Sequence, residues 1–254
     1  MSKLNFIGCG NFNNTELGNN CAYYAISNEE LILFDCGGDV FQKLLKTNLI
    51  YKGLKKLIIC ITHCHDDHIG SLSSLLHYMK IYYPNTDVSI CTSNAVAFEL
   101  KNILSIMGNE NIPMAGNCIS SNFELYSFNT EHVDYCNSCG FILLDKTDLS
   151  NNIVHIFSGD TNDFIGWNAI DILLEQYCTL KDTQKVYIYH DASTRLNKVH
   201  IFIYTLISEY IKFRNRYKNK FDIQLVCMHI EDKDAINNII DAGSLRDYEI
   251  YVAE

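Results

Sequence analysis

The sequence contains few prolines and no long apolar run. Only Pro84 and Pro113 occur in 254 residues, and no Gly/Ser-rich linker, low-complexity stretch or short-period repeat is present. We therefore expect one domain over residues 1–254 rather than a repeat array or two linked domains. No stretch approaches the ~18 consecutive apolar residues of a membrane-spanning helix, and the opening MSKLNFIGCG lacks a basic leader and a long apolar signal core. We expect a soluble cytoplasmic protein without a membrane partner.

Positive charge is also scarce. The chain has 20 Lys and Arg against 30 Asp and Glu, a formal net charge of -10. Such a field repels a large polyanion, so extended nucleic acid is not the expected partner. The exception is the basic segment KFRNRYKNK at 212–220, which we interpret as the carboxyl end of a helix with its loop, where cations suit the helix dipole. A phosphate-binding patch is the alternative.

Eleven cysteines are present, but they are scattered along a long chain. Without any sign of secretion, reduced thiols are a better interpretation than a disulfide framework. Cys136 and Cys139 form a single C-x-x-C, whereas a structural zinc site normally needs a second pair. We therefore expect these two thiols to be incidental.

Short β-rich runs and helical patterns follow one another along the chain. Helices are predicted at 39–47, 69–82, 94–107, 167–177 and 199–213. Strands are predicted at 4–8, 21–26, 31–37, 54–62, 87–92, 123–132, 139–145, 152–160, 185–191 and 222–229. Two successive sets of strands with interleaved helices indicate an α/β sandwich, with two sheets packed face to face and covered by helices.

The strongest functional signal is THCHDDHIG at 62–70, directly after the apolar strand LIICI. It places His63, His65, Asp67 and His68 within six positions, and imidazole and carboxylate groups are the ligands of zinc-class ions. Alternate residues of an extended loop point the same way. His63 and His65 can thus share one ion while Asp67 and His68 turn toward another.

This motif and its surroundings resemble the metallo-β-lactamase superfamily over nearly the whole chain. FIGCG, NNCAYYAI and LILFDCGG are similar to its first strands and turn, and FNTEHVDYCNSCGFIL is similar to its third motif. HIFSGDT resembles the fourth motif, and DIQLVCMH the last. The resemblance implies an αβ/βα four-layer sandwich with two mixed sheets flanked by helices. It also implies metal-ligand roles for His132 and His229 and a bridging role for Asp160.

Two divalent ions follow from that ligand set, zinc being the expected metal and Mn or Fe possible occupants of the same donors. One ion is assigned His63, His65, His132 and Asp160. The other is assigned Asp67, His68, Asp160 and His229. His190 and His200 compete with His229 for the final position.

Within the superfamily, the nearer resemblance is to ribonuclease Z and related phosphodiesterases. HIGSLSSLL and SGDT point that way, YIYHDAS resembles that group's His-Glu-Ala-Thr segment, and KVHIFIYTL resembles its following histidine motif. The resemblance implies that Asp191 orients His200, carried on a helix, and that His200 protonates the leaving oxygen. The chain departs from the pattern here, because Asp replaces Glu and the interval to His200 is short.

A metal pair of this kind is suited to hydrolysis, with Asp67 orienting the attacking water. Phosphodiester hydrolysis is the leading class, and two alternatives compete within it. One is a tRNA 3'-end endonuclease of the ribonuclease Z type. The other is a phosphodiesterase for 3',5'-cyclic mononucleotides, resembling phage-encoded anti-Pycsar enzymes. We favour the second, because the chain is acidic and shows no basic, Gly-rich arm between His68 and His132.

Other classes remain open at this stage. A lactone, β-lactam or thioester hydrolase would use the same metals without His200. A catalytically silent, metal-stabilised binding module is the non-enzyme alternative. A homodimer is implied by the resemblance alone.

Overall fold

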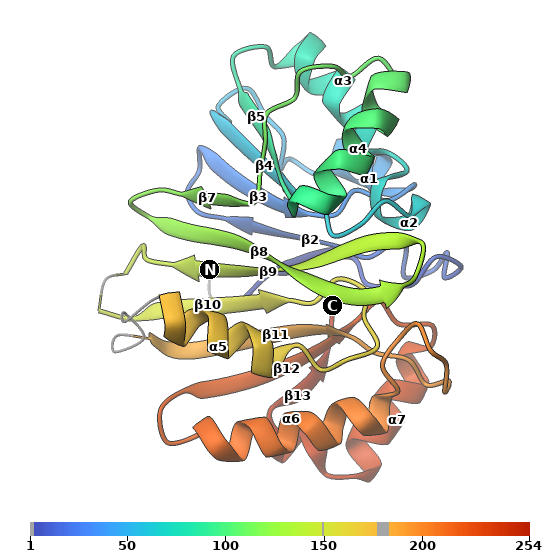
Figure 1. Cartoon of the computed structure of the whole chain (residues 1–254), viewed down its shortest axis with the longest axis vertical. Helices are drawn as coiled ribbons and strands as arrows, with labels where there is room; N and C mark the ends of the chain where they lie inside the picture. Colours follow the sequence, from blue (N-terminus) through green and yellow to red (C-terminus); the bar gives the residue numbers. More distant parts are fainter. Residues whose placement is uncertain (1–2, 149, 177–182) are drawn as a thin grey trace.

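The computed structural model describes residues 3–148, 150–176 and 183–254. Two β-sheets lie face to face in the middle of the molecule, and helices cover the outer side of each (Figure 1). This is the predicted α/β sandwich. Within these residues, no helix is both long and apolar enough to cross a membrane.

The first sheet is mixed and comes from the amino-terminal half. Its first two neighbouring pairs are antiparallel and the following three are parallel. Its strands, in spatial order, are β1 (Asn5–Gly8), β2 (Cys21–Ala25), β3 (Glu30–Phe34), β4 (Lys56–Cys60), β5 (Asp87–Cys91) and β6 (Met114–Ala115).

The second sheet is also mixed. Parallel pairs join β13 to β10, and antiparallel pairs join β10 to β7. Its strands, in spatial order, are β13 (Ile250–Val252), β12 (Asp222–Met228), β11 (Thr183–Asp191), β10 (Asn152–Phe157), β9 (Cys136–Asp145), β8 (Phe123–Val133) and β7 (Asn117–Ile119).

The helices divide between the two outer faces (Figure 1). The first sheet carries α1 (Val40–Lys46), α2 (Asp66–Ile69), α3 (Leu72–Tyr82) and α4 (Asn94–Ile106). The second carries α5 (Gly166–Gln176), α6 (Ile203–Tyr217) and α7 (Lys233–Ala242), and the short 3₁₀ helix η2 (Leu245–Tyr248) precedes β13.

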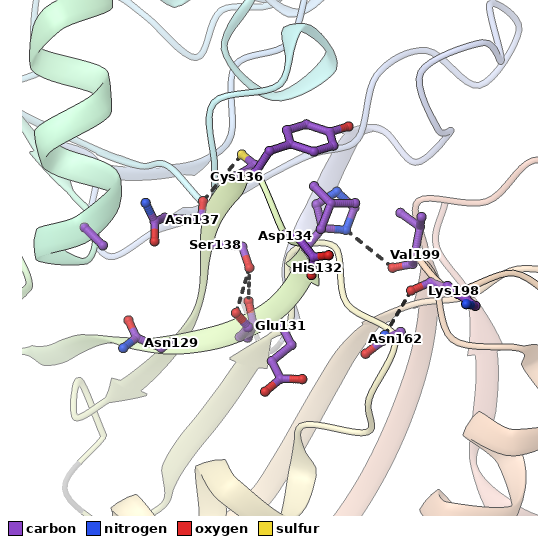
Figure 2. A pocket seen from close by; sticks show the side chains of 14 residues that line it. Asn129, Glu131, His132, Asp134, Cys136, Asn137, Ser138, Asn162, Lys198 and Val199 are labelled. Atoms are coloured by element: carbon purple, nitrogen blue, oxygen red, sulfur yellow. Dashed lines mark hydrogen bonds between the residues drawn. The ribbon is translucent and has the colours of Figure 1, made fainter.

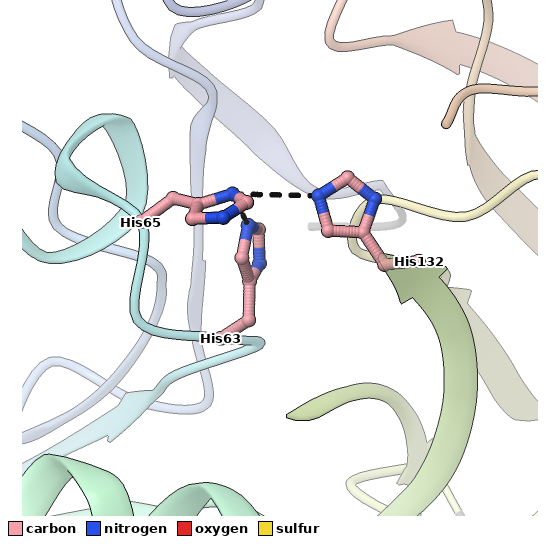
Figure 3. A group of neighbouring side chains, drawn as sticks. All are labelled: His63, His65 and His132. Carbon is pink, nitrogen blue, oxygen red and sulfur yellow. Dashed lines mark hydrogen bonds between the residues drawn. The ribbon is translucent and has the colours of Figure 1, made fainter. Parts of the chain in front are cut away.

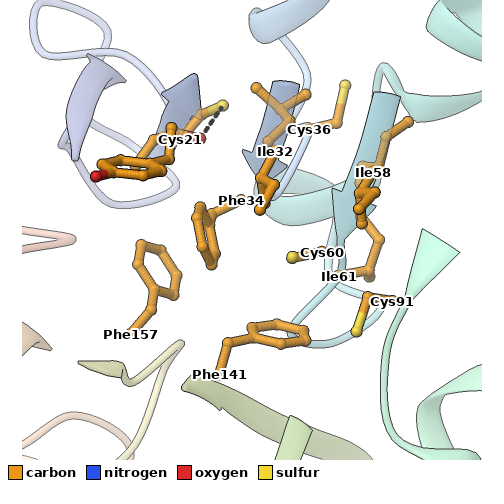
Figure 4. Close-up of a cluster of buried hydrophobic side chains, with 14 of the residues drawn as sticks. Cys21, Ile32, Phe34, Cys36, Ile58, Cys60, Ile61, Cys91, Phe141 and Phe157 are labelled. Atoms are coloured by element: carbon orange, nitrogen blue, oxygen red, sulfur yellow. Dashed lines mark hydrogen bonds between the residues drawn. The ribbon is translucent and has the colours of Figure 1, made fainter. Parts of the chain in front are cut away.

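Aliphatic, cysteine and phenylalanine side chains pack together in the core of the first sheet and its contact with the second (Figure 4). Phe34 of β3 stacks on Phe157 of β10, with ring centroids 5.0 Å apart, and meets Phe141 of β9 edge-on at 6.0 Å. All three rings are fully buried. Such pairs add about 0.5–1.5 kcal/mol each beyond the burial of apolar area. These rings pack β3 of the first sheet against β9 and β10 of the second.

The predicted helix at 199–213 is wrong at its start. Helix α6 begins at Ile203, so His200 lies in the preceding loop and not on the helix. Tertiary hydrogen bonds explain the difference: Ile201 N donates to Thr161 O at 3.0 Å, and Ser193 N donates to Ile201 O at 2.9 Å. These bonds tie Ile201 to neighbouring loops, so the helix begins only at Ile203 despite the apolar pattern of 199–202. The prediction of a helix end in the basic segment is confirmed, because α6 ends at Tyr217.

The sequence pattern predicted no element after residue 229 and none between 107 and 123. The structure has α7, η2 and β13 in the first region and the short strands β6 and β7 in the second. The predicted helix at 167–177 matches α5, and its last residue lies outside the described residues. Cysteines within the described residues are free thiols, most of them buried.

Candidate metal centre

Three histidines converge where β4 and β8 end. His63 and His65 belong to the loop after β4, and His132 lies near the end of β8 (Figure 3). His63 Nε2 lies 2.9 Å from His65 Nδ1, which lies 3.4 Å from His132 Nε2. Burial lowers the pKa of the His63 and His132 imidazoles, so both favour the neutral form that binds metal. Three facing nitrogens make a donor set for one ion.

A second donor group joins α2 to the end of β12. Asp67 and His68 lie on α2, and His229 follows directly after β12. His229 Nε2 lies 3.2 Å from Asp67 Oδ2, and His68 Nε2 lies 3.5 Å from the same oxygen. His229 has a φ of 53°, a left-handed conformation that a non-glycine residue adopts at some cost. In this strained backbone conformation, the His229 imidazole faces the donor groups.

Asp160 lies between the two groups. Its Oδ2 is 3.9 Å from His63 Nε2, 3.8 Å from His132 Nε2 and 3.4 Å from His229 Nε2. Its Oδ1 is 3.4 Å from His68 Nε2. One carboxylate thus reaches donors of both groups, which is the position that a bridging ligand requires.

Gly159 allows this placement. It has a φ of 61°, and a Cβ there would lie 2.8 Å from Thr62 Cβ and 2.9 Å from Cys139 O. Only glycine fits both the conformation and the space. The Ser-Gly-Asp sequence after β10 therefore brings the Asp160 backbone close against the loop that carries His63.

Asp35 lies behind the donor groups and orients one imidazole of each group, His68 directly and His63 through Thr62. Asp35 Oδ2 accepts a hydrogen bond from His68 Nδ1 at 2.9 Å, and the Thr62 hydroxyl donates to Asp35. Because that hydroxyl proton is used, Thr62 Oγ1 is left to accept from His63 Nδ1 at 3.1 Å. Both rings then turn Nε2 toward the cluster. Such outer contacts fix the tautomer of metal-binding histidines.

The cluster has polar atoms that the chain does not satisfy. Within the described residues, four buried atoms of the cluster make no hydrogen bond and face one another in pairs: His68 Nε2 lies 3.4 Å from Asp160 Oδ1, and His229 Nδ1 lies 3.6 Å from Asp191 Oδ1. Burial opposes protonation of His229, but Asp160, Asp191 and Asp67 outweigh it and raise its pKa to about 10. Buried carboxylates therefore draw positive charge to this place. The donor set fits divalent cations, and imidazole with carboxylate is the chemistry of zinc.

Asp191 and His200 form a pair beside the donor groups. His200 Nδ1 lies 2.7 Å from Asp191 Oδ2, which also accepts from Thr161 N at 3.1 Å. His200 Nδ1 is 4.0 Å from Asp160 Oδ2. Asp191 therefore contacts His200, although its side chain is shorter than the Glu of the ribonuclease Z pattern and few residues separate it from His200. His190, the other competitor for the His229 position, points elsewhere: its Nε2 accepts from Ile165 N at 3.3 Å.

With this geometry described, known proteins can be compared. A family model described as "Anti-Pycsar protein Apyc1" matches residues 2–243. The chain belongs to this family. A stretch of 54 residues is 39% identical to the probable metallo-hydrolase YqgX of Bacillus subtilis (strain 168). That match covers 21% of this chain and only 25% of the relative's length.

Two solved structures share the whole fold. The metallo-β-lactamase fold protein YhfI from Bacillus subtilis is 15% identical, with a TM-score of 0.68 over 99% of this chain and 96% of that chain. Human tRNase Z, short form, is 18% identical, with a TM-score of 0.64 over 99% and 96%. The αβ/βα sandwich implied by the sequence resemblance is therefore confirmed as the metallo-β-lactamase fold.

Two neighbouring cavities open beside the centre. One, of about 640 Å³, lies over the donor groups and has Phe12, Tyr135 and Asn197 among its lining. The other, of about 870 Å³, lies along the β8–β9 hairpin and is lined by Glu131, Ser138 and Lys198 among others (Figure 2). His132 and Tyr135 line both. The donor groups are thus accessible to a substrate through a broad groove.

All sequence-predicted site residues come together in this one region. Three residues of each predicted set lie together, His63, His65 and His132 in one group and Asp67, His68 and His229 in the other. Asp160 is grouped with His63 and His68, and also with Asp191, His200 and His229, and the division into two metal sites stays a prediction. Sequence reasoning missed the orienting role of Asp35 and Thr62. Their only signal was a carboxylate and a hydroxyl directly after apolar strands, which does not reveal a contact across 27 residues. Cys139 is buried against Thr92 and takes no part in the donor groups.

Proposed function

We propose that the chain is a metal-dependent phosphodiesterase that hydrolyses 3',5'-cyclic mononucleotides to linear monophosphates. The observation that carries the proposal is the Asp191–His200 pair at the edge of two metal-donor groups. The pair can give a proton to the alkoxide that leaves a phosphodiester, whereas the thiolate that leaves a thioester needs none. Membership of the Anti-Pycsar protein family supports the cyclic substrate.

The ions would be held by His63, His65 and His132 on one side, with Asp67, His68 and His229 on the other and Asp160 shared. When bound, such a pair lowers the pKa of a water toward ~7 and polarises a phosphoryl oxygen. Zinc fits this donor set, and Mn or Fe can occupy similar ligands.

The chain's own side chains supply the remaining steps. Asp67 accepts a hydrogen bond from the attacking water and orients it. His200 donates Nδ1–H to Asp191 Oδ2, which keeps Nε2 turned away from that carboxylate as the proton donor to the leaving oxygen. Burial opposes protonation of His200, but the Asp191 carboxylate outweighs it and raises the pKa of the imidazole. His200 is therefore held in its acid form more readily than a free histidine.

Charge around the groove supports a small substrate over RNA. Among the described residues that line the cavity over the donor groups, none is Lys or Arg and Asp66 is one of the lining residues. The described residues that line the two neighbouring cavities include one such cation each, Lys198 and Arg195. A cyclic mononucleotide carries one phosphodiester, whereas a precursor tRNA carries dozens of phosphates that need cationic contacts. Extended nucleic acid is thus not the partner we propose.

A substrate panel tests the proposal. Metal-loaded protein should convert cyclic CMP, UMP, AMP or GMP to linear monophosphates, and His63→Ala should abolish turnover. His77→Ala is the matched control, because His77 lies outside the donor groups and should leave turnover intact. Cleavage of precursor tRNA, a lactone or nitrocefin without turnover of any cyclic nucleotide would reject the proposal.

We also propose a homodimer, the assembly implied by the family resemblance. Light scattering coupled to size-exclusion chromatography should give twice the 29.1 kDa chain mass. A mass of one chain at micromolar concentration would contradict this.

A further inference from the structure

Phe12 is an exposed aromatic ring beside the donor groups. Its residue is 70% exposed, and it lines the cavity over the donor groups together with His200 and His229. Single exposed apolar side chains are common on protein surfaces, so the feature of interest is the place of this ring at the cavity over the donor groups.

The backbone on both sides of Phe12 is anchored. Asn11 N donates to Ile230 O at 3.2 Å, and the Asn14 side-chain amide donates to Glu231 O at 3.0 Å. Both acceptors follow His229 in the chain, so the loop that carries Phe12 is tied to the strand end that carries a metal donor. The backbone that carries the ring is therefore held in place beside the cavity that Phe12 lines.

A second exposed ring, Tyr135, lies on the other side of the same cavity. Its residue is 82% exposed, and its ring centroid lies 6.1 Å from that of His65. Tyr135 also lines the cavity along the β8–β9 hairpin, whereas Phe12 does not. Phe12 instead lines a third cavity, of about 410 Å³, beside His200 and Arg195. The two rings thus mark opposite ends of the groove.

The chemistry of a cyclic mononucleotide indicates which end of the groove the ribose and base occupy. Both ester oxygens of its phosphate belong to one ribose, so the nucleoside is attached to the leaving oxygen. In-line attack places that oxygen opposite the water, and His200 is the group that protonates it. Ribose and base must therefore extend toward the side of the groove on which His200 lies, which is the side of Phe12.

We propose that Phe12 is the platform on which the nucleobase of the substrate stacks, and this inference rests on the proposed function. Stacking on an aromatic side chain contributes about 1–3 kcal/mol per base and tolerates any base, because every base has a flat face. Two amide oxygens of the cavity over the donor groups are already engaged: Asn197 Oδ1 accepts from Val199 N and His200 N, and Asn19 Oδ1 accepts from Asp39 N. The face of the Phe12 ring offers the base a contact that does not depend on these oxygens.

A comparison of substrates with and without a base tests this. The substrates are cyclic GMP, cyclic CMP and the abasic ribose 3',5'-cyclic phosphate, which has the same phosphodiester. Phe12→Ala should raise KM for the two nucleotides by about 5- to 100-fold, more for the purine, and leave kcat nearly unchanged. The abasic compound should be cleaved equally by both proteins, and Phe12→Tyr should restore the wild-type KM.

Two further variants serve as controls. Phe98→Ala removes an equally exposed ring of α4, 74% exposed, that lines none of the cavities described above, and should change nothing. Tyr135→Ala should raise KM less than Phe12→Ala. An equal rise in KM for the abasic compound, no rise for either nucleotide, or the larger effect from Tyr135→Ala would overturn the platform. If the wild-type protein hydrolysed none of the three substrates, the proposed function itself would be rejected. Failure of the platform and failure of the proposed function therefore give different results.

Discussion

Two buried polar clusters lie between the sheets, and they differ in how far the chain satisfies them. In the middle of the sandwich, Tyr24 donates to Asp145, and Tyr189 accepts from Leu4 N at 2.8 Å and lies 3.3 Å from His155 Nδ1. There, His155 Nε2 is the cluster atom without a partner among the described residues. Most of the polar atoms of this closed cluster are therefore hydrogen-bonded within the chain, and the cluster stabilises the fold.

At the strand ends, the donor groups leave more of their buried polar atoms without a hydrogen bond. Four buried atoms of the donor groups make no hydrogen bond within the described residues, and three carboxylates meet there: Asp67, Asp160 and Asp191. An unsatisfied buried polar group destabilises a fold by about 1–3 kcal/mol, more when it is charged. Similar residue types therefore stabilise the fold in the middle of the sandwich and offer donors for a cation at the strand ends.

Removing the shared carboxylate should have the broadest effect, because it changes metal content and turnover together. Asp160→Ala should lower metal content well below the wild-type value of about two equivalents per chain and reduce turnover by about 10²-fold or more, because both donor groups lose a ligand. Elemental analysis of the purified variant measures the first quantity. Unchanged metal content would remove Asp160 from the centre.

His200→Ala separates proton donation from metal binding. This variant should keep its metal yet lose about 10²- to 10⁴-fold in rate on a cyclic nucleotide, the usual worth of general acid catalysis. The loss should shrink on bis(p-nitrophenyl) phosphate, whose leaving group needs no proton. Equal losses on both substrates would show that His200 binds or positions the substrate instead.

Asp35→Asn weakens the orientation of His68 and, through Thr62, of His63. Outer contacts of this kind are worth about 10- to 100-fold in metal affinity, so chelator competition should reveal a loss of that size. Asp87→Asn is the matched control, because Asp87 is exposed at the start of β5. Equal affinities in the two variants would contradict the role of Asp35.

The closed cluster predicts a smaller, pH-dependent effect on stability. Burial lowers the pKa of His155 to about 3, against about 6.5 in an unfolded chain. The unfolded state therefore binds the proton first, and stability is lost as pH falls below about 6.5, by about 2 kcal/mol at pH 5. His155→Phe should lack this loss. Denaturant unfolding of both proteins in chelator at pH 8 and pH 5 measures it, and parallel pH curves would argue against the assignment.

The sequence predicted the sandwich and the loop at 62–70 because both depend on local patterns. His132, Asp160 and His229 are single residues far apart in the chain, and only the family resemblance identified them. The orienting role of Asp35 was not predicted, because it depends on a contact between the ends of two strands. The start of α6 was misplaced because hydrogen bonds to Thr161 and Ser193 override an apolar pattern that reads as helical.

The short elements were missed for a related reason. Strand β13 has only three residues and exists because β12 pairs with it. No local pattern distinguishes such a strand from a loop, since a partner supplies the hydrogen bonds. The same holds for β6, which is held by β5.

The most direct test is a zinc titration of chelator-treated protein while cyclic nucleotide hydrolysis is followed. We predict no turnover without metal and a rise that ends at about two equivalents per chain, as a two-ion centre requires. Asp160→Ala, titrated alongside, should show no such end point. Undiminished turnover in the chelator-treated wild-type protein would contradict the account.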